Sequence, residues 1–117
     1  MATIAEQTTG QVDERYGNKF IPVTVNAAGT AIDVTTALLG GLLVTEAAGA
    51  VTVTIPESTA AAGKVFPIGS TFDVFCAGAG GVTVAKTGSD TLTGTATIAQ
   101  NGRKTVTKVA ATEWVIA

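Results

Sequence analysis

The sequence predicts an all-β protein, a small antiparallel β-sandwich or barrel with an extended N-terminal arm. Short runs recur in which apolar and polar residues alternate, and the clearest is Val51 to Ile55, which reads VTVTI. Alternation with a period of two places the apolar side chains on one face of a strand. Threonine occurs at 21 positions and serine at three, which favours strands because a branched Cβ suits a pleated surface.

Length and composition indicate one domain with a modest core. The chain has 117 residues, of which 46% are apolar and only 5% aromatic. We assign residues 1–19 to the arm and residues 20–117 to a single β domain, and we expect an oligomer interface to cover apolar surface that a core of Ala and Val leaves exposed. The net charge is −2 with 14% charged residues, which argues against a nucleic-acid partner because such a partner requires a basic patch.

The arm, residues 1–19, shows neither the period of a strand nor that of a helix, and it concentrates charged and amide side chains around two glycines. One interpretation is a frayed terminus without consequence. The other is contact with a partner or a neighbouring subunit, in which aromatic rings supply contact area at low entropic cost. The partner-binding residues predicted on this basis are Glu14, Arg15, Tyr16, Lys19 and Phe20.

The first half of the domain is expected to contain strands joined by short turns. The alternation from Phe20 to Val25 includes Pro22, which confines it to an edge or to the opening residues of a strand. A turn at Asn26 to Gly29 allows Ala31 to Thr36 to pair back. The pair Gly40-Gly41 predicts a turn or bulge, because a helix through two glycines would lose roughly 2 kcal/mol relative to alanine.

A faint repeat links three of the turns. Asn26 to Val34, Glu46 to Val53 and Cys76 to Val84 each contain a small Gly turn followed by an alternating strand. Their unequal spacing is taken to exclude a solenoid register, so we expect recurring hairpins in which Gly supplies positive φ. Ala77 to Gly81 is likewise expected to be a hairpin turn and not a phosphate-binding loop, since neither Lys-Ser/Thr nor a helix follows it.

The second half is predicted to continue the sheet to the last residues. Pro56 ends pairing after the VTVTI run. The further elements expected are two strand pieces bent at Pro67 to Ser70, a turn at Gly88 to Asp90, a Thr-rich strand pair, an Asn101-Gly102 hairpin, and strands at Lys104 to Ala110 and Glu113 to Ile116.

Residue types for catalysis, metal binding or cofactor binding are scarce. The chain has no His, which excludes Ser-His-Asp and Cys-His arrangements and imidazole ligands. Cys76 is the sole cysteine, and its apolar neighbours predict a small buried hydrophobe. The acidic residues Glu46, Glu57, Asp73 and Asp90 are scattered beside turns. We expect no enzyme activity, no catalytic residues, no metal and no cofactor.

Trp114 is the single tryptophan of the chain and lies near its C-terminal end. Trp114 is expected to close one end of the core, and the alternative is a solvent-facing platform for a ligand such as a sugar.

The N-terminus lacks the blocks of a signal peptide, and the longest apolar run, Ala37 to Val44, is too short to span a bilayer. We therefore expect a soluble chain synthesised in a cytoplasm, without a membrane partner.

Several motifs occur in a fixed order over somewhat more than half of the chain. Phe66-Pro67-Ile68-Gly69-Ser70 opens a strand, Gly78 to Val84 forms a turn and strand, Gly88 to Leu92 forms a turn, and Trp114 precedes Ile116 by two residues in the closing strand. In this order they resemble a small β module that recurs in structural proteins of tailed bacteriophages, both capsid decoration (cement) proteins and domains of head or tail fibres.

The resemblance implies a non-enzymatic virion component, commonly trimeric, that acts by protein–protein contact. We favour a decoration protein that binds the major capsid protein on the outer capsid surface and stabilises the lattice, with the arm reaching across adjoining capsid subunits. The sequence has its own Met1, and no heptad, collagen or shaft repeat precedes the module. The alternative is a head- or tail-fibre module that binds a host receptor or glycan. In either case synthesis is expected in the host cytoplasm.

Overall fold

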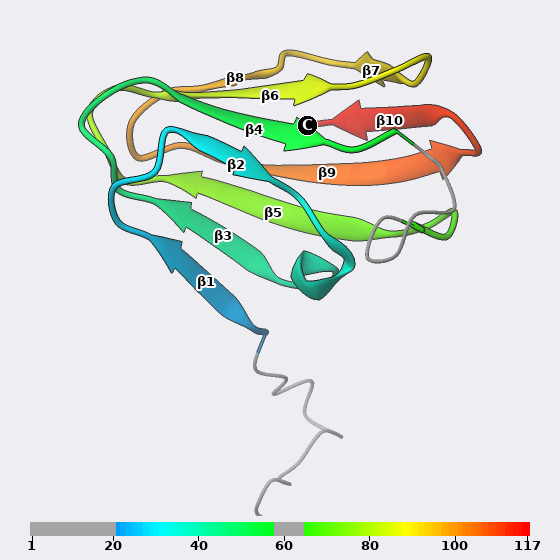
Figure 1. Ribbon diagram of the computed structural model, residues 1–117, viewed down its shortest axis with the longest axis horizontal. Coiled ribbons are helices and arrows are strands. Elements are labelled where there is room, and N and C mark those ends of the chain that lie inside the picture. The colour runs from blue at the N-terminus through cyan, green and yellow to red at the C-terminus, as the bar shows by residue number, and fades with distance from the viewer. Residues whose placement is uncertain (1–20, 58–64) are drawn as a thin grey trace, which may run out of the picture.

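The protein is built from two β-sheets that face each other, as a computed structural model describes for residues 21–57 and 65–117 (Figure 1). The strands, in chain order, are β1 (Val23–Asn26), β2 (Ala31–Asp33), β3 (Leu42–Thr45), β4 (Val51–Ile55), β5 (Thr71–Cys76), β6 (Val82–Lys86), β7 (Thr91–Thr93), β8 (Thr97–Ile98), β9 (Arg103–Ala110) and β10 (Glu113–Ile116). A short 3-10 helix, η2 (Thr36–Leu38), lies between β2 and β3.

The two sheets confirm the prediction of an all-β, sandwich-like protein, but most of the pairing differs from the prediction. One sheet has the order β1-β3-β5-β9-β10-β7 and the other has the order β2-β4-β6-β8. Antiparallel pairing, which we predicted throughout, occurs between β5 and β9, β9 and β10, and β6 and β8. The prediction is wrong for β1-β3, β3-β5, β2-β4, β4-β6 and β10-β7, which are parallel.

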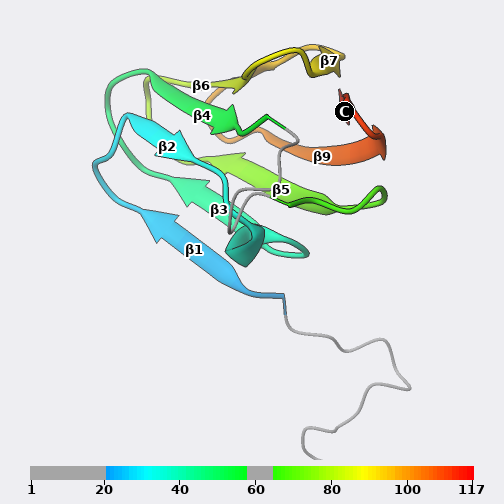
Figure 2. The same ribbon diagram turned by 45° about the vertical axis from the view of Figure 1, so that its right-hand side comes forward.

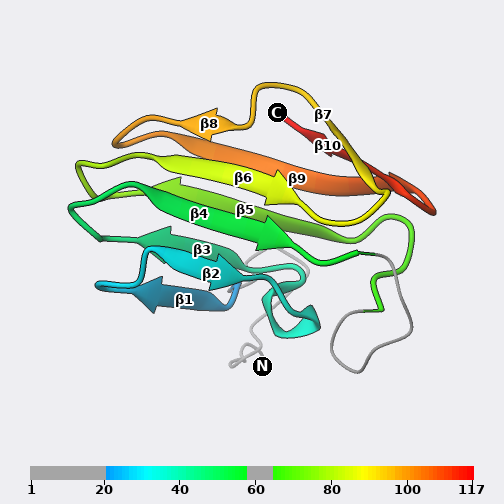
Figure 3. The ribbon, with the colours of Figure 1, turned by 45° about the horizontal axis from the view of Figure 1, so that its top comes forward.

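Three successive strand pairs, β1-β2, β3-β4 and β5-β6, stack on one another as coils of a short solenoid (Figure 2). In each coil the chain runs along the six-stranded sheet, crosses a short turn and returns along the four-stranded sheet (Figure 3). The conclusion that unequal spacing excludes a solenoid register is therefore wrong. Val25 pairs with Val44, 19 residues later, and Val44 pairs with Phe75, 31 residues later. Most of the additional residues lie in the connection from Pro56 to Ser70, where they leave the register unchanged.

Small residues allow the turns of neighbouring coils to approach closely. A Cβ atom at Gly78 would collide with the backbone of Ala47, and a Cβ atom at Gly80 would collide with the backbone of Gly49. Glycine is required at these two positions because only a residue without Cβ permits such an approach of two backbones. The faint sequence repeat therefore corresponds to turns that stack on one another in successive coils.

The turns predicted as hairpins are present, but they join strands that belong to different sheets. Asn26 to Gly29 leads from β1 to β2, and Ala77 to Gly81 leads from β5 to β6. The Asn101-Gly102 turn leads from β8 to β9, and the Thr-rich strands β7 and β8 also lie in different sheets. Asn101 does adopt a positive φ of 68°. The hairpin predictions are wrong because small residues and positive φ serve a crossing between two sheets equally well.

Other local predictions are confirmed. The turn at Gly40-Gly41 follows η2, with Gly40 at φ 73° and the N–H of Gly41 donating to the carbonyl of Leu38 at 2.9 Å. β1 begins directly after Pro22 and lies at the edge of its sheet. The strands predicted at Lys104 to Ala110 and at Glu113 to Ile116 correspond to β9 and β10.

The core lies between the two sheets and is completed by a cluster of aromatic rings. Trp114 is fully buried and meets Phe66 and Phe72 edge to face, with ring centroids 5.5 and 6.3 Å apart. Its expected place in the core is confirmed, so the alternative of a solvent-facing ligand platform is wrong. Cys76 is 1% exposed, which confirms a buried hydrophobe. Around these residues the core consists of branched aliphatic side chains from both sheets, chiefly Val34, Leu43, Val51, Val53, Ile55, Val74, Val82, Val84, Ile98, Val106 and Ile116.

Candidate interaction surface

Apolar side chains gather on the outer face of the six-stranded sheet, next to its β1 edge. The register places Val25, Val44 and Phe75 in one row across β1, β3 and β5, and it places Val23 beside Leu42 in the next row. The intervening residues of β3 and β5 are buried, so these side chains face away from the core. Val23, Val25, Leu42, Val44 and Phe75 are called the outer patch below.

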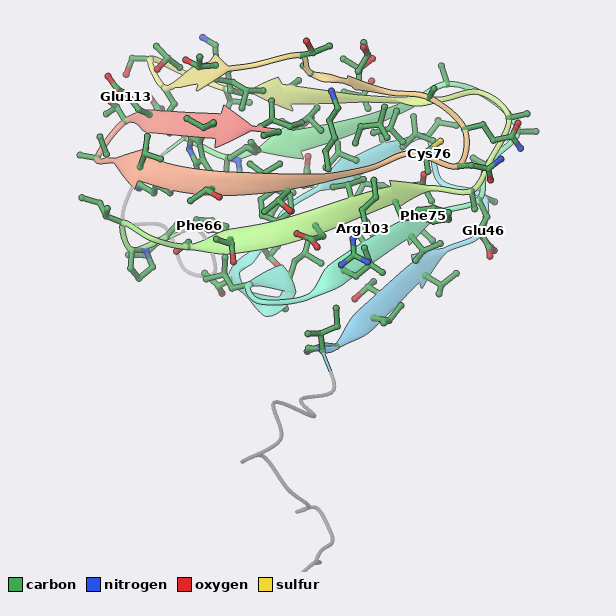
Figure 4. The ribbon with its side chains drawn as sticks, turned by 180° about the vertical axis from the view of Figure 1, so that it is seen from behind. Glu46, Phe66, Phe75, Cys76, Arg103 and Glu113 are labelled. Atoms are coloured by element: carbon green, nitrogen blue, oxygen red, sulfur yellow. The ribbon has the colours of Figure 1, made fainter. Side chains whose placement is uncertain are left out.

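The outer patch is accessible to a partner. Val23 and Val25 expose 55% and 56% of their surface, and the adjoining Ile21 exposes 45%. Leu42, Val44 and Phe75 are partly exposed. Figure 4 looks onto this side of the molecule and shows Phe75 close to Arg103. An apolar area on a protein surface is a candidate site of interaction with another protein.

An ion pair borders the outer patch. Arg103 of β9 lies opposite Phe75, and Asp73 of β5 lies opposite Leu42. The Nε atom of Arg103 donates to Oδ2 of Asp73 at 3.1 Å, and the two side chains are 49% and 23% exposed. An exposed pair of this kind contributes less than about 1 kcal/mol to stability. Its position gives the apolar area a charged border.

β1 presents a free backbone edge beside the same patch, since β3 is its partner strand within the described residues. The N–H of Leu42 donates to the carbonyl of Pro22, and the N–H of Glu46, just after β3, donates to the carbonyl of Asn26, both at 2.9 Å. The backbone groups at these alternate positions of β1 therefore face β3. The backbone groups of Val23 and Val25 consequently point to the free edge. Such an edge is a template on which a further strand can be added.

A pocket of about 130 Å³ opens between the sheets at the same end of the stack. Its lining is mostly apolar, from Ile32, Val34, Leu38 and Leu43, with Asp33 as the one charged residue of the lining. Thr24 of β1 also contributes, which shows that the inward side of β1 is the threonine side and not the valine side. With a single carboxylate, the pocket lacks the paired acids that hydrolysis of a sugar requires.

Charged groups also occur in the interior, around Trp114. Its Nε1 donates to Oδ2 of Asp90 at 3.2 Å, and Nζ of Lys108 lies 5.8 Å from the ring centroid. Asp90 and Lys108 are 1% and 5% exposed. Because all three side chains are enclosed, this group fixes the end of the sheet and offers no surface to a ligand.

The carboxylates considered as catalytic candidates lie apart, most of them in separate structural contacts. Oε2 of Glu57 accepts a hydrogen bond from the N–H of Ser89 at 3.2 Å. Asp73 forms an ion pair with Arg103, and Asp90 accepts a hydrogen bond from Trp114. Glu46 is exposed beside a turn. In the two described ranges, no group of three or more His, Cys, Asp or Glu residues is arranged to hold a metal ion.

The predicted partner-binding residues Glu14, Arg15, Tyr16, Lys19 and Phe20 lie outside the residues that the structure describes. The outer patch was not predicted. Its signal in the sequence is the presence of apolar residues on both faces of a strand, as in the consecutive Leu42, Leu43 and Val44. A strand that is apolar on both faces needs cover on both faces.

No protein-family model, curated protein or solved structure matches this chain. Among the described residues, no helix has the length and apolar character needed to cross a membrane.

Proposed function

We propose that the protein is a non-enzymatic decoration (cement) protein of a phage virion, which binds the outer surface of the head and stabilises the capsid lattice. The observation that carries the proposal is the outer patch, an apolar area on a sheet with the ion pair of Asp73 and Arg103 at its border. An apolar centre with a polar rim is the usual composition of a protein–protein interface. The virion location rests on the resemblance of residues 51–117 to phage structural modules.

The mechanism is stabilisation by mass action. A protein that binds the assembled lattice and not its separate subunits lowers the free energy of the assembled state alone. Contacts repeated over many copies act together, so that modest individual affinities give a large total effect. In this proposal the copies associate as homo-trimers, and the outer patch supplies the apolar surface that contacts the major capsid protein.

The test compares two charge substitutions at exposed valines. Val25→Glu places a carboxylate in the outer patch, and the matched control Val109→Glu places one at a valine that is 47% exposed outside it. Cosedimentation of the full chain with undecorated capsids should show at least about a tenfold loss of affinity for Val25→Glu, because an unpaired carboxylate is costly to bury in an apolar contact. Unchanged binding of Val25→Glu, with Val109→Glu also bound, would exclude the outer patch as the capsid contact.

A second function, a head- or tail-fibre module that binds a host receptor or glycan, is favoured by one observation. The three coils stack in a single direction, and such stacks grow into extended shafts by addition of further coils. Copy number separates the two functions. Quantitative mass spectrometry of purified virions should find the protein in numbers comparable to the capsid subunits if it decorates the head, and in few copies if it belongs to a fibre.

A further inference from the structure

We propose that two copies of the chain associate through β1, which pairs antiparallel with β1 of the partner subunit about a two-fold axis at Thr24. The six-stranded sheet then continues from one copy into the other. The pairing concerns the free protein in solution, so it does not depend on the proposed virion function.

β1 lacks the features that protect the other end strands of the two sheets. Natural proteins shield a sheet edge by short strands, charged side chains, proline or a bulge. β8 has two residues, β7 has three, and β2 has three and carries the exposed Asp33. β1 has four residues without a charge, and its register with β3 runs unbroken from Val23 to Asn26. Within the described part of the chain, β1 is therefore the end strand most open to a further strand.

The free hydrogen-bonding groups of β1 fit a second copy of the same strand. Val23 and Val25 direct their backbone groups to the free edge, whereas Thr24, between them, directs its groups to β3. Hydrogen-bonded and non-hydrogen-bonded pairs alternate along an antiparallel ladder. With Thr24 opposite the partner subunit's Thr24 as a non-hydrogen-bonded pair, Val23 and Val25 of the partner subunit form the hydrogen-bonded pairs on either side. This arrangement uses the edge groups of both valines in both copies.

The two-fold symmetry follows from the order Val-Thr-Val in β1. Because the edge-facing residues lie symmetrically about Thr24, an axis there gives both copies the same contacts, as in most homodimers. A register shifted by two residues would place one of the valines opposite a residue outside β1. A shift by one residue would place a valine opposite Thr24, whose backbone groups face β3. The register centred on Thr24 is the one that pairs β1 with itself completely.

The side chains agree with this pairing on both faces of the sheet. Opposite residues in an antiparallel pair share a face, so Val23 meets Val25 of the partner subunit on the outer face. Both valines expose more than half of their surface in the single copy, and pairing joins the two outer patches into one apolar area. Thr24 meets its counterpart on the inner face, beside the pocket that it lines. Since β1 carries no charge, like charges do not oppose each other within this strand pair.

Disulfide trapping tests the register. Thr24→Cys places two thiols at the axis, where the Cα atoms of a non-hydrogen-bonded pair lie about 4.5 Å apart, within the range of a disulfide. The matched control Val23→Cys places its thiols on a diagonal, roughly 7–8 Å apart and beyond that range. With oxidised glutathione, Thr24→Cys should form covalent dimers at least about tenfold faster than Val23→Cys. Equal rates for the two variants would overturn the proposal; Cys76 is buried and common to both.

Sedimentation equilibrium tests the association without an added thiol. Val25→Pro removes an N–H that faces the free edge and leaves the bonds to β3 in place, whereas Val25→Thr keeps both the N–H and a branched side chain. The wild type and Val25→Thr should have twice the mass of Val25→Pro at equal protein concentration, whether the smaller unit is a monomer or a trimer. Slow amide exchange of the buried strand β5 in all three proteins reports an intact fold. Equal masses would contradict the pairing.

A different occupant of the edge, such as another segment of the same chain, gives a distinct result. The amide of Val25 would then exchange slowly in the wild type although its mass equals that of Val25→Pro, and this outcome also overturns the proposal. All of these measurements use the free protein without capsids. Their failure is therefore distinguishable from a failure of the capsid cosedimentation.

Discussion

Trp114→Ala is the substitution expected to destabilise the protein most strongly. The indole is fully buried and meets Phe66 and Phe72 edge to face, so its removal leaves a cavity in the centre of the aromatic cluster. Loss of a buried aromatic side chain costs about 3–5 kcal/mol. The carboxylate of Asp90 also loses the Nε1 donor at 3.2 Å. Since small domains are stable by about 5–15 kcal/mol, this loss would unfold a domain at the low end of that range and would lower the denaturation midpoint of a more stable one.

The assay is urea denaturation followed by far-ultraviolet circular dichroism, because the substitution removes the only tryptophan. Trp114→Phe separates the two contributions, since it keeps an aromatic ring and loses the donor to Asp90; its free energy of unfolding should fall by about 1–3 kcal/mol. Val109→Ala, at an exposed position, should change it by less than about 0.5 kcal/mol. A loss below about 1 kcal/mol for Trp114→Ala, with an unchanged slope, would refute the account of the core.

Three other features have measurable consequences, namely the stacked turns, the surface ion pair and the buried thiol. Gly78→Ala should lower the free energy of unfolding by about 1–3 kcal/mol, because the added Cβ collides with the backbone of Ala47. Gly49→Ala should be nearly neutral, because its Cβ would meet only a methyl group at 3.9 Å. Thermal melts of the two variants compare these effects directly. A double-mutant cycle on Asp73 and Arg103 should give a coupling below about 1 kcal/mol that weakens with salt, and a salt-insensitive coupling would contradict the exposed geometry. Cys76, 1% exposed, should react with a chromogenic thiol reagent only as the chain unfolds, so rapid labelling of the native protein would disprove its burial.

Strand positions could be predicted from the sequence, whereas strand partners could not. Val51 to Ile55 and Glu113 to Ile116 carry their alternation within a few residues, and the structure has strands there. Pairing is a non-local property. Val44 meets Phe75 because the connection from Pro56 to Ser70 absorbs the difference in spacing, and no local pattern records that. The Gly turns were wrongly predicted as hairpins for a related reason. Their residues indicate that the chain changes direction there, but they do not indicate which sheet the next strand joins.

The candidate surface was only partly accessible to sequence-based reasoning. Alternation in β1 shows that Val23 and Val25 share a face, but not which face is covered; the contact of Thr24 with the pocket decides that the valines point outward. The predicted partner contacts of Tyr16 and Phe20 stay predictions, because these residues lie outside the described ranges. What the structure adds is the position of the valines on an edge strand, beside the partly exposed side chains of β3 and β5.

The order of strands also has a consequence for the nascent chain. β7 pairs with β10, with Thr91 beside Glu113, so a strand that leaves the ribosome early must wait for one that is synthesised later. Until then Asp90 lacks the Nε1 donor of Trp114, which has not yet been synthesised. A chain halted between the two strands would carry β7 without β10, its partner strand among the described residues. β10 completes the six-stranded sheet, because it pairs with β9 on one side and with β7 on the other.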